Sequence, residues 1–296
     1  MWRIWAAAVF WGFNWPAVKI VLSSAGPWTL RAAGLAGGAG LLLAVAMASG
    51  RSLSIERKDW ATLALAGIFG VAGFNICAVF AQLSMPTSRA AILTFTMPLW
   101  VALFSWLFLG ETLDRLRLAA LAIGALGLGV LSVPFWPIIR DGGVPFGLVY
   151  VLGAAIMWAA GTVIIKGRPV AADPLAVTAW QITVAAVACT LGMAAFETPH
   201  LDLGRVEVAA AFAYHVVLPQ AAAYALWFNL IGRVPASTAA LGTLLIPIFG
   251  VMGAVLLLDD WPTPLDLAGL GLILAAVGVD QVLRARGAAQ QVQQLP

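Results

Sequence analysis

Long apolar segments separated by short polar ones run along almost the whole chain. The segment between Ala90 and Gly110 is typical, because it has no formally charged residue and as a helix it crosses about 30 Å of hydrocarbon at about 1.5 Å per residue. About ten such segments are predicted, at residues 3–23, 27–49, 60–82, 88–109, 116–135, 144–166, 174–196, 206–231, 235–258 and 264–283. The pattern predicts an all-α integral membrane protein with ten transmembrane helices.

One of these segments occurs twice. Residues 235–260 repeat much of residues 86–111 at an offset of 149; the matched pairs include Pro86 and Pro235, Ser88 and Ser237, Thr94 and Thr243, Pro98 and Pro247, and Glu111 and Asp260. The following segments also match, and a weaker match places Trp11 and Lys19 on Trp158 and Lys166. The repeat unit is therefore about five helices.

An odd number of helices in the unit makes the second copy enter the membrane from the opposite side. The sequence thus predicts two inverted five-helix repeats, at residues 1–141 and 142–286, followed by a disordered cytoplasmic tail at 287–296. Pro98 and Pro247 interrupt the repeated helix and are predicted hinges. Inverted repeats with broken helices are typical of alternating-access transport.

Composition and charge agree with a membrane protein. Hydrophobic residues make up 62% of the chain and charged ones 10%, which excludes a soluble domain, and a net charge of +3 is too small to indicate a nucleic-acid partner. Lys and Arg are about twice as frequent at one set of helix ends, which places both termini in the cytoplasm. Cys77 and Cys189 lie in apolar segments, as small buried residues rather than a disulfide or a metal pair.

Several short motifs add a family resemblance. They are Trp11, Gly12 and Asn14 with Lys19 at the end of the first segment, the pattern Ala-Ala-x-x-Thr-x-x-x-Pro at 90–98, and Leu-Gly-Glu at 109–111. In this order, and duplicated, they resemble the EamA-type branch of the drug/metabolite transporter superfamily. The many Trp residues in the segments most resemble the bacterial aromatic amino acid exporters of the YddG type. The resemblance implies export of small metabolites through a central cavity, without ATP, across a bacterial inner membrane.

The sequence contains no recognisable catalytic, metal or cofactor motif. The zinc-protease, serine-hydrolase and nucleotide-loop patterns are absent, and the two histidines are His200 in a predicted outer loop and His215 in a helix. A hydrogen-bonded structural role for His215 is favoured over a proton relay. An integral-membrane enzyme acting on lipid is a remote alternative, and the missing nucleophile–base pair argues against it.

The placement of charge bears on the energy source and the substrate. No Asp or Glu is expected at the middle of the membrane, which favours facilitated diffusion over proton- or sodium-coupled antiport. Lys19, Arg31 and Lys166 lie one or two turns inside helix ends, where snorkelling or pairing at the rim is favoured over substrate contact. Without a central cation, phosphorylated substrates are disfavoured.

Aromatic and neutral polar residues are what remains at mid-membrane. An aromatic wall with a few amide and hydroxyl groups suits a zwitterion with an apolar side chain. The candidate substrate-binding residues are Trp11, Asn14, Asn75, Thr94, Trp100, Trp158, Tyr224 and Trp227. The predicted function is export of aromatic and other hydrophobic amino acids, and the alternative is a broad drug or metabolite exporter of the same fold. A monomer and a homodimer both remain open.

Overall fold

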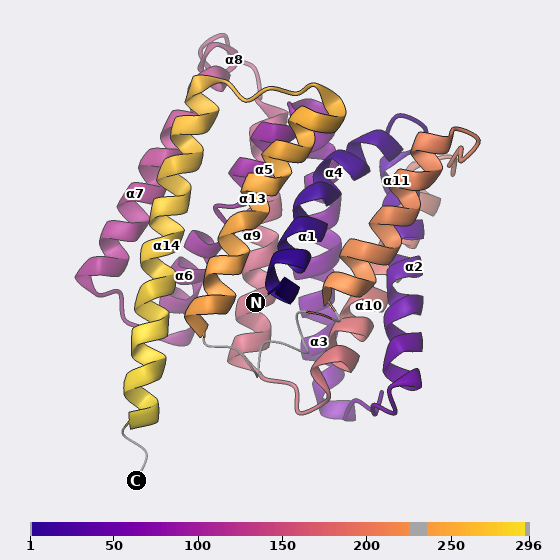
Figure 1. Cartoon of the computed structure of the whole chain (residues 1–296), viewed down its shortest axis with the longest axis horizontal. Helices are drawn as coiled ribbons and strands as arrows, with labels where there is room; N and C mark the ends of the chain where they lie inside the picture. Colours follow the sequence, from indigo (N-terminus) through magenta and orange to yellow (C-terminus); the bar gives the residue numbers. More distant parts are fainter. Residues whose placement is uncertain (1, 225, 227–235, 294–296) are drawn as a thin grey trace.

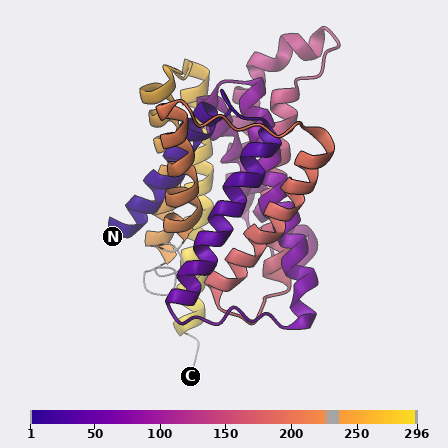
Figure 2. The same ribbon diagram turned by 90° about the vertical axis from the view of Figure 1, so that its right-hand side faces the viewer.

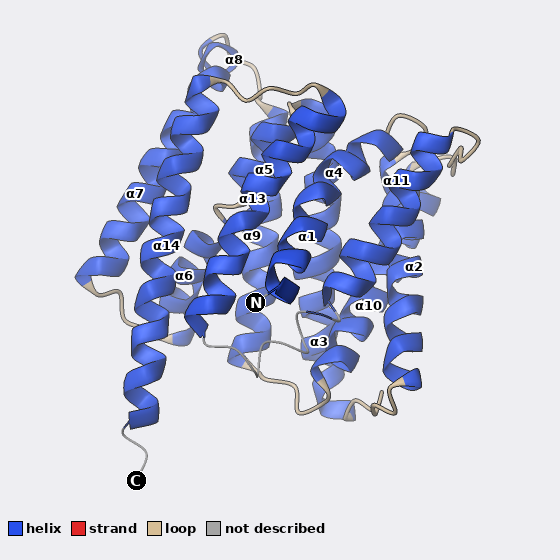
Figure 3. Cartoon of the chain, in the orientation of Figure 1, coloured by secondary structure: helices blue, strands red, loops and turns tan. Residues whose placement is uncertain are grey.

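The described part of the chain is entirely helical. The structure is a computed structural model that describes residues 2–224, 226 and 236–293, with side chains described for residues 5–224, 226 and 244–279. Within these residues the chain forms helices joined by short loops and no strand (Figures 1 and 3). The helices lie roughly along one direction, and the two views at right angles show a single bundle (Figure 2). The prediction of an all-α fold is confirmed.

The helical elements follow one another in a simple order. They are α1 (Trp2–Val21), α2 (Pro27–Ala48), η1 (Arg57–Asp59), α3 (Trp60–Ala66), η2 (Gly67–Gly73), α4 (Phe74–Ser84), α5 (Thr87–Thr94), α6 (Met97–Leu109), α7 (Arg115–Ser132), η3 (Val133–Phe135), α8 (Trp136–Arg140), α9 (Phe146–Gly167), α10 (Pro174–Phe196), α11 (Val206–Val217), η4 (Leu218–Ala222), α13 (Ala236–Leu258) and α14 (Pro264–Gln293).

Six helical stretches in the described residues are long and apolar enough to cross a membrane. They are Pro27–Ala48, Arg57–Ser84, Thr87–Leu109, Arg115–Arg140, Phe146–Gly167 and Pro174–Phe196. Shorter apolar helices lie at Val206–Ala222, Leu244–Leu258 and Pro264–Val279. Lengths and hydropathy of this kind are those of an integral membrane protein.

Two kinds of irregularity interrupt these helices. Between α5 and α6 the chain makes a tight turn at Phe95 and Thr96, directly before Pro98, which has no N–H to continue the helix. The second kind is a widened π-helical segment, η2 after α3 and η4 after α11. Such segments leave backbone groups without their usual helical partners and often occur at functional sites. Pro247 lies inside α13, which runs without interruption.

Close helix approach depends on glycine at a few positions. A Cβ at Gly161 in α9 would lie 2.4 Å from the Cα of Gly70 in η2, so neither position has room for a side chain. A Cβ at Gly12 in α1 would lie 2.4 Å from the Cβ of Phe249 in α13. These contacts bring η2 against α9 and α1 against α13, which places the middles of these elements around one central region.

The two ends of the bundle are named here after the short helices that mark them. The α8 end, at the top of Figure 1, includes the connections after α1 and α10, joined by a hydrogen bond from the Gly26 N–H to the His200 carbonyl (3.3 Å). The α3 end, at the bottom, includes the connections after α2 and α9, joined by an ion pair between Arg51 and Asp173 (2.8 Å). The chain therefore alternates between these ends.

The last helix is longer than expected. The sequence predicts a helix to residue 283 and a disordered tail at 287–296, but α14 continues to Gln293. The segment from Gly287 to Gln293 contains Ala and Gln, which are good helix formers, and a helix that is already nucleated extends at little cost. The structure therefore describes residues 287–293 as a continuation of α14, and the disordered cytoplasmic tail stays a prediction.

Candidate functional site

A cavity of about 860 Å³ lies inside the bundle. Side chains from α1, α2, α4, α6, α9 and α10 line it, together with both π-helical segments. Its lining includes Pro169, Val170 and Ala172 from the connection between α9 and α10. The cavity therefore passes through the centre of the bundle and reaches the α3 end. Its volume is in the range of small-molecule binding sites, about 300–1,000 Å³.

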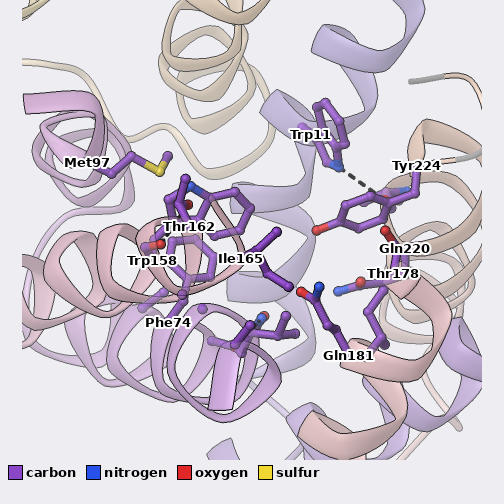
Figure 4. Close-up of a pocket in the computed structure, with 18 of the residues that line it drawn as sticks. Trp11, Phe74, Met97, Trp158, Thr162, Ile165, Thr178, Gln181, Gln220 and Tyr224 are labelled. Carbon is purple, nitrogen blue, oxygen red and sulfur yellow. Dashed lines mark hydrogen bonds between the residues drawn. The ribbon is translucent and has the colours of Figure 1, made fainter. Parts of the chain in front are cut away.

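Aromatic pairs form two of its walls (Figure 4). Trp11 in α1 lies edge-to-face against Tyr224, with ring centroids 5.4 Å apart, and Trp158 in α9 lies edge-to-face against Phe74, with centroids 5.1 Å apart. Edge-to-face contacts of this kind hold ring orientations and are worth about 0.5–1.5 kcal/mol beyond area burial. The two pairs thus present oriented rings from opposite sides of the cavity.

The π-helical segment η4 fixes the ring of Trp11. The indole N–H of Trp11 donates to the backbone oxygen of Pro219 (3.2 Å). Pro219 lies in η4, where the wider helix leaves carbonyl groups available to side chains. Gln220, the next residue, also faces the cavity. The irregular backbone of η4 therefore positions one aromatic wall.

Asn14 holds a buried histidine at the cavity wall. The Oδ1 of Asn14 lies 2.6 Å from the Nδ1 of His215, so the ring donates this hydrogen bond. His215 is fully buried, and its Nε2 has no hydrogen-bond partner in the structure. A Cβ at Gly34 would lie 2.6 Å from that Nε2, so the ring fits only against a glycine of α2. The favoured structural role of His215 agrees with this hydrogen bond.

Some of the predicted substrate-binding residues line the cavity and others do not. Five of them line the cavity: Trp11, Asn14, Asn75, Trp158 and Tyr224. The amide of Asn75 also donates to the Val71 carbonyl (2.8 Å). Trp227 lies outside the described residues. These positions do not test substrate contact, which stays a prediction.

Two of the predicted residues are directed elsewhere. Thr94 is fully buried in α5, and its hydroxyl donates to the Ala90 carbonyl (2.7 Å) one turn earlier, outside the cavity lining. Trp100 packs on Phe104 of its own helix, with centroids 6.5 Å apart, and is also outside the lining. Of the predicted hinges, Pro98 lines the cavity and Pro247 does not, although Ile246 beside it does. The hinge roles stay predictions.

Several cavity residues were not predicted from the sequence. The polar ones are Gln82, Thr162, Thr178, Gln181 and Gln220. Thr178 and Gln181 are three residues apart on α10, and this spacing is a sequence signal because it places them on one helix face. Their amide and hydroxyl groups add polar atoms to a lining that is otherwise mostly apolar toward the α3 end.

Arg31 corrects an expectation from the sequence. Its side chain was expected to snorkel or pair at the rim, but it is 3% exposed and lines the cavity. The sequence gives the depth of Arg31 along α2 and not the direction in which it faces, and α2 turns this position inward. A cationic side chain therefore lies at the cavity, which also removes the reason for disfavouring phosphorylated substrates.

Among the described residues, acidic side chains lie at the ends of the bundle and not at the cavity. None of the described residues that line it is Asp or Glu. At the α8 end Asp260 accepts from the backbone N–H and hydroxyl of Ser88 (3.0 and 2.9 Å), and at the α3 end Glu111 pairs with Lys166. Within the described part of the chain, no group of three or more His, Cys, Asp or Glu side chains is placed to hold a metal ion.

Comparison with known proteins gives the family. The model of the EamA-like transporter family matches residues 2–133 and again residues 145–279. The chain belongs to the EamA-like transporter family. The prediction of an EamA-type transporter from the sequence is thereby confirmed, and membership of a transporter family argues against an enzyme.

Relatives in this family carry transporter names. The chain is 27% identical to the uncharacterized transporter YvbV of Bacillus subtilis, over 91% of this chain and 87% of the relative. It is 25% identical to a probable terminal-alkyne amino-acid exporter of Streptantibioticus cattleyicolor, over 94% and 91%. It is 26% identical to a probable amino-acid metabolite efflux pump of Salmonella typhimurium, over 92% and 91%.

A crystal structure of a protein shares the fold. It superposes with a TM-score of 0.64, covers 94% of this chain and 96% of its own, and is 23% identical in sequence. At this identity the likeness bears on the fold alone. It agrees with the helical bundle described above.

Proposed function

We propose that this protein is a bacterial inner-membrane exporter of amino acids, with aromatic and other hydrophobic ones preferred, that works by alternating access. The observation that carries this proposal is the pair of edge-to-face ring contacts, Trp11 with Tyr224 and Trp158 with Phe74, on two walls of one cavity. Fixed rings bind the flat apolar side chain of such a substrate with little loss of entropy. Two relatives whose names refer to amino acids add support.

Alternating access rests on the proposed arrangement of ten helices in two inverted repeats. Three observations support it. The family model matches the two halves of the chain separately. The π-helical segments contain Gly70 and Pro219, which are partners at the offset of 149. Finally, α1 packs on α13 as α9 packs on α6, and these pairs are equivalent in the two repeats.

The same proposal includes the energy source and the orientation. With no carboxylate among the described residues that line the cavity, the substrate is proposed to move down its own gradient. The Lys and Arg excess supports an orientation with both termini, and with them the α3 end, in the cytoplasm. The open side of the cavity then faces the compartment from which an exporter takes its substrate.

A transport assay with the purified protein in liposomes tests the function. The panel contains phenylalanine, tryptophan, threonine and the cationic dye ethidium, each added inside with an efflux readout. The proposal expects phenylalanine and tryptophan to move fastest and ethidium not to move above empty liposomes. Equal movement of the dye would instead favour the alternative of a broad drug or metabolite exporter, and movement of no amino acid would refute the proposed substrate class.

A further inference from the structure

One charged side chain at the cavity has no counter-ion. Arg31 lies in the second turn of α2, 3% exposed, and its Nε has no hydrogen-bond partner in the structure. No hydrogen bond or ion pair of Arg31 is found within the described residues, whereas Arg51 pairs with Asp173 and Lys166 pairs with Glu111. An unpaired charge inside a membrane protein is costly and is retained where function needs it.

The groups that surround Arg31 do not supply a negative charge. His215 of α11 and Cys189 of α10 lie within electrostatic range of its guanidinium, and neither is a carboxylate. The acid of α10 at this end, Glu197, is already engaged, because its carboxylate accepts from the N–H groups of Trp28 and Thr29 (both 3.0 Å) at the start of α2. Within the described residues no acidic side chain therefore pairs with Arg31, and a bound anion can supply the counter-ion.

A second unpartnered group lines the cavity at a similar level along the bundle. Gln82 is two residues before the end of α4 and 1% exposed, it lines the cavity, and its Oε1 accepts no hydrogen bond. Like Arg31, it lies toward the α8 end of its helix, whereas the cavity opens toward the α3 end. Two buried polar groups thus face the closed end of the cavity, one able to bind an anion and one able to accept from a donor.

We propose that Arg31 binds the α-carboxylate of the transported substrate and that Gln82 accepts from its α-ammonium group. This inference rests on the proposed transport of amino acids, because a zwitterionic head group supplies both an anion and an N–H donor. A guanidinium binds a carboxylate through two parallel hydrogen bonds, which fixes the head group at the closed end. The side chain then extends toward the ring pairs of Trp11 and Trp158 at mid-cavity.

The test measures equilibrium binding to the purified full-length protein with three ligands that share one ring. Phenylalanine carries both head groups, phenylpyruvate lacks the ammonium, and phenethylamine lacks the carboxylate. Arg31→Gln is expected to weaken binding of phenylalanine and phenylpyruvate about tenfold or more and to change that of phenethylamine less than about threefold. Arg31→Lys keeps the charge and is expected to lose less than Arg31→Gln.

Two further variants sharpen the assignment. Gln82→Leu is expected to weaken binding of phenylalanine and phenethylamine and to leave binding of phenylpyruvate unchanged. For the two single-head-group ligands this is the reverse of the pattern expected for Arg31→Gln. Arg205→Gln is the matched control, because Arg205 is an exposed arginine paired with Glu207 far from the cavity lining, and no ligand should respond to it. A wild-type measurement guards against a folding defect in the variants: benzoate, but not benzamide, should displace phenylpyruvate.

The outcomes separate this inference from the proposed transport. The carboxylate site would be overturned if Arg31→Gln weakened binding of all three ligands to the same degree and benzoate did not displace phenylpyruvate from the wild type. It would also be overturned if the wild-type protein bound neither phenylalanine nor phenylpyruvate. The carboxylate site would also be overturned if binding of phenyl phosphate depended on Arg31 while binding of phenylalanine and phenylpyruvate did not. If phenylpyruvate binding depends on Arg31 but no amino acid is transported, the site stands and the transport proposal fails.

Discussion

Removing one ring from the aromatic walls should change substrate preference more than total transport. Trp158 lines the cavity and is held edge-to-face by Phe74 at 5.1 Å, so its ring is already oriented before a substrate arrives. A substrate ring that stacks on it gains about 0.5–1.5 kcal/mol beyond area burial. Since about 1.4 kcal/mol is tenfold in affinity, Trp158→Ala should weaken apparent affinity for phenylalanine about two- to twelvefold.

Threonine supplies the internal comparison. It has no ring to stack, so Trp158→Ala should change the apparent affinity for threonine less than about twofold. The assay reports the ratio of the apparent affinities for phenylalanine and threonine. Initial rates of efflux from liposomes over a range of concentrations give both constants from one preparation. Trp11→Ala should give the same pattern, because Trp11 is the repeat partner of Trp158 and faces the same cavity.

A matched control is available outside the cavity. Trp261 is 70% exposed at the α8 end, where its indole N–H donates to Asp259, so Trp261→Ala should leave the phenylalanine-to-threonine ratio unchanged. An equal loss for both substrates in Trp158→Ala, with normal protein yield, would show that the ring packs helices and does not contact substrate. The aromatic-cavity assignment would then have to be abandoned.

Three other results are expected. Cysteine placed at the exposed His200 should react with an impermeant reagent from the periplasm, and cysteine at the exposed Ser54 should not; the opposite labelling would contradict the orientation. Efflux from liposomes should proceed without an imposed pH or sodium gradient, and strict dependence on either would show coupling. Gly161→Leu should prevent assembly of the bundle, measured as loss of a monodisperse species in detergent, because its Cβ alone would meet the Cα of Gly70 at 2.4 Å.

The sequence predicted the level of residues in the membrane better than their direction. Trp11, Asn14 and Trp158 were expected near the cavity from depth and from the repeat, and they line it. Thr94 shares that depth, but its hydroxyl turns back to the Ala90 carbonyl, a local bond that Thr in a helix commonly makes and that sequence alone does not decide. Arg31 lies near a helix end, yet it faces inward.

The reason is that the helices are apolar on all sides. A soluble helix shows its buried face by an apolar stripe, whereas a helix in lipid is apolar both where it packs and where it meets the bilayer. Rotation is then set by contacts such as Gly161 against Gly70, which depend on a helix distant in sequence. The π-helical segments η2 and η4 likewise follow from tertiary packing, and no motif in the sequence predicted them.

The two ends of the bundle are held by similar contacts at repeat-equivalent positions. At the α8 end, Asp260 bonds to Ser88 and lies within electrostatic range of Lys19. At the α3 end, Glu111 pairs with Lys166. Glu111 and Asp260, like Lys19 and Lys166, are partners in the two repeats. The proposed alternating access would need two closed ends of comparable free energy, since shifting a two-state equilibrium from 1:99 to 99:1 takes about 5.5 kcal/mol.

One contact breaks this equivalence. Arg89 of α5 pairs with Asp266 of α14 at 2.6 Å, largely buried at the α8 end. The repeat partners of these residues are Thr238 and Arg117, so the sequence cannot form the same ion pair at the α3 end. Breaking a buried, hydrogen-bonded pair costs more than breaking an exposed one, for which about 0–1 kcal/mol is usual. The α8 end therefore has a largely buried ion pair whose repeat equivalent is missing at the α3 end, which is the end that the cavity reaches at the connection between α9 and α10.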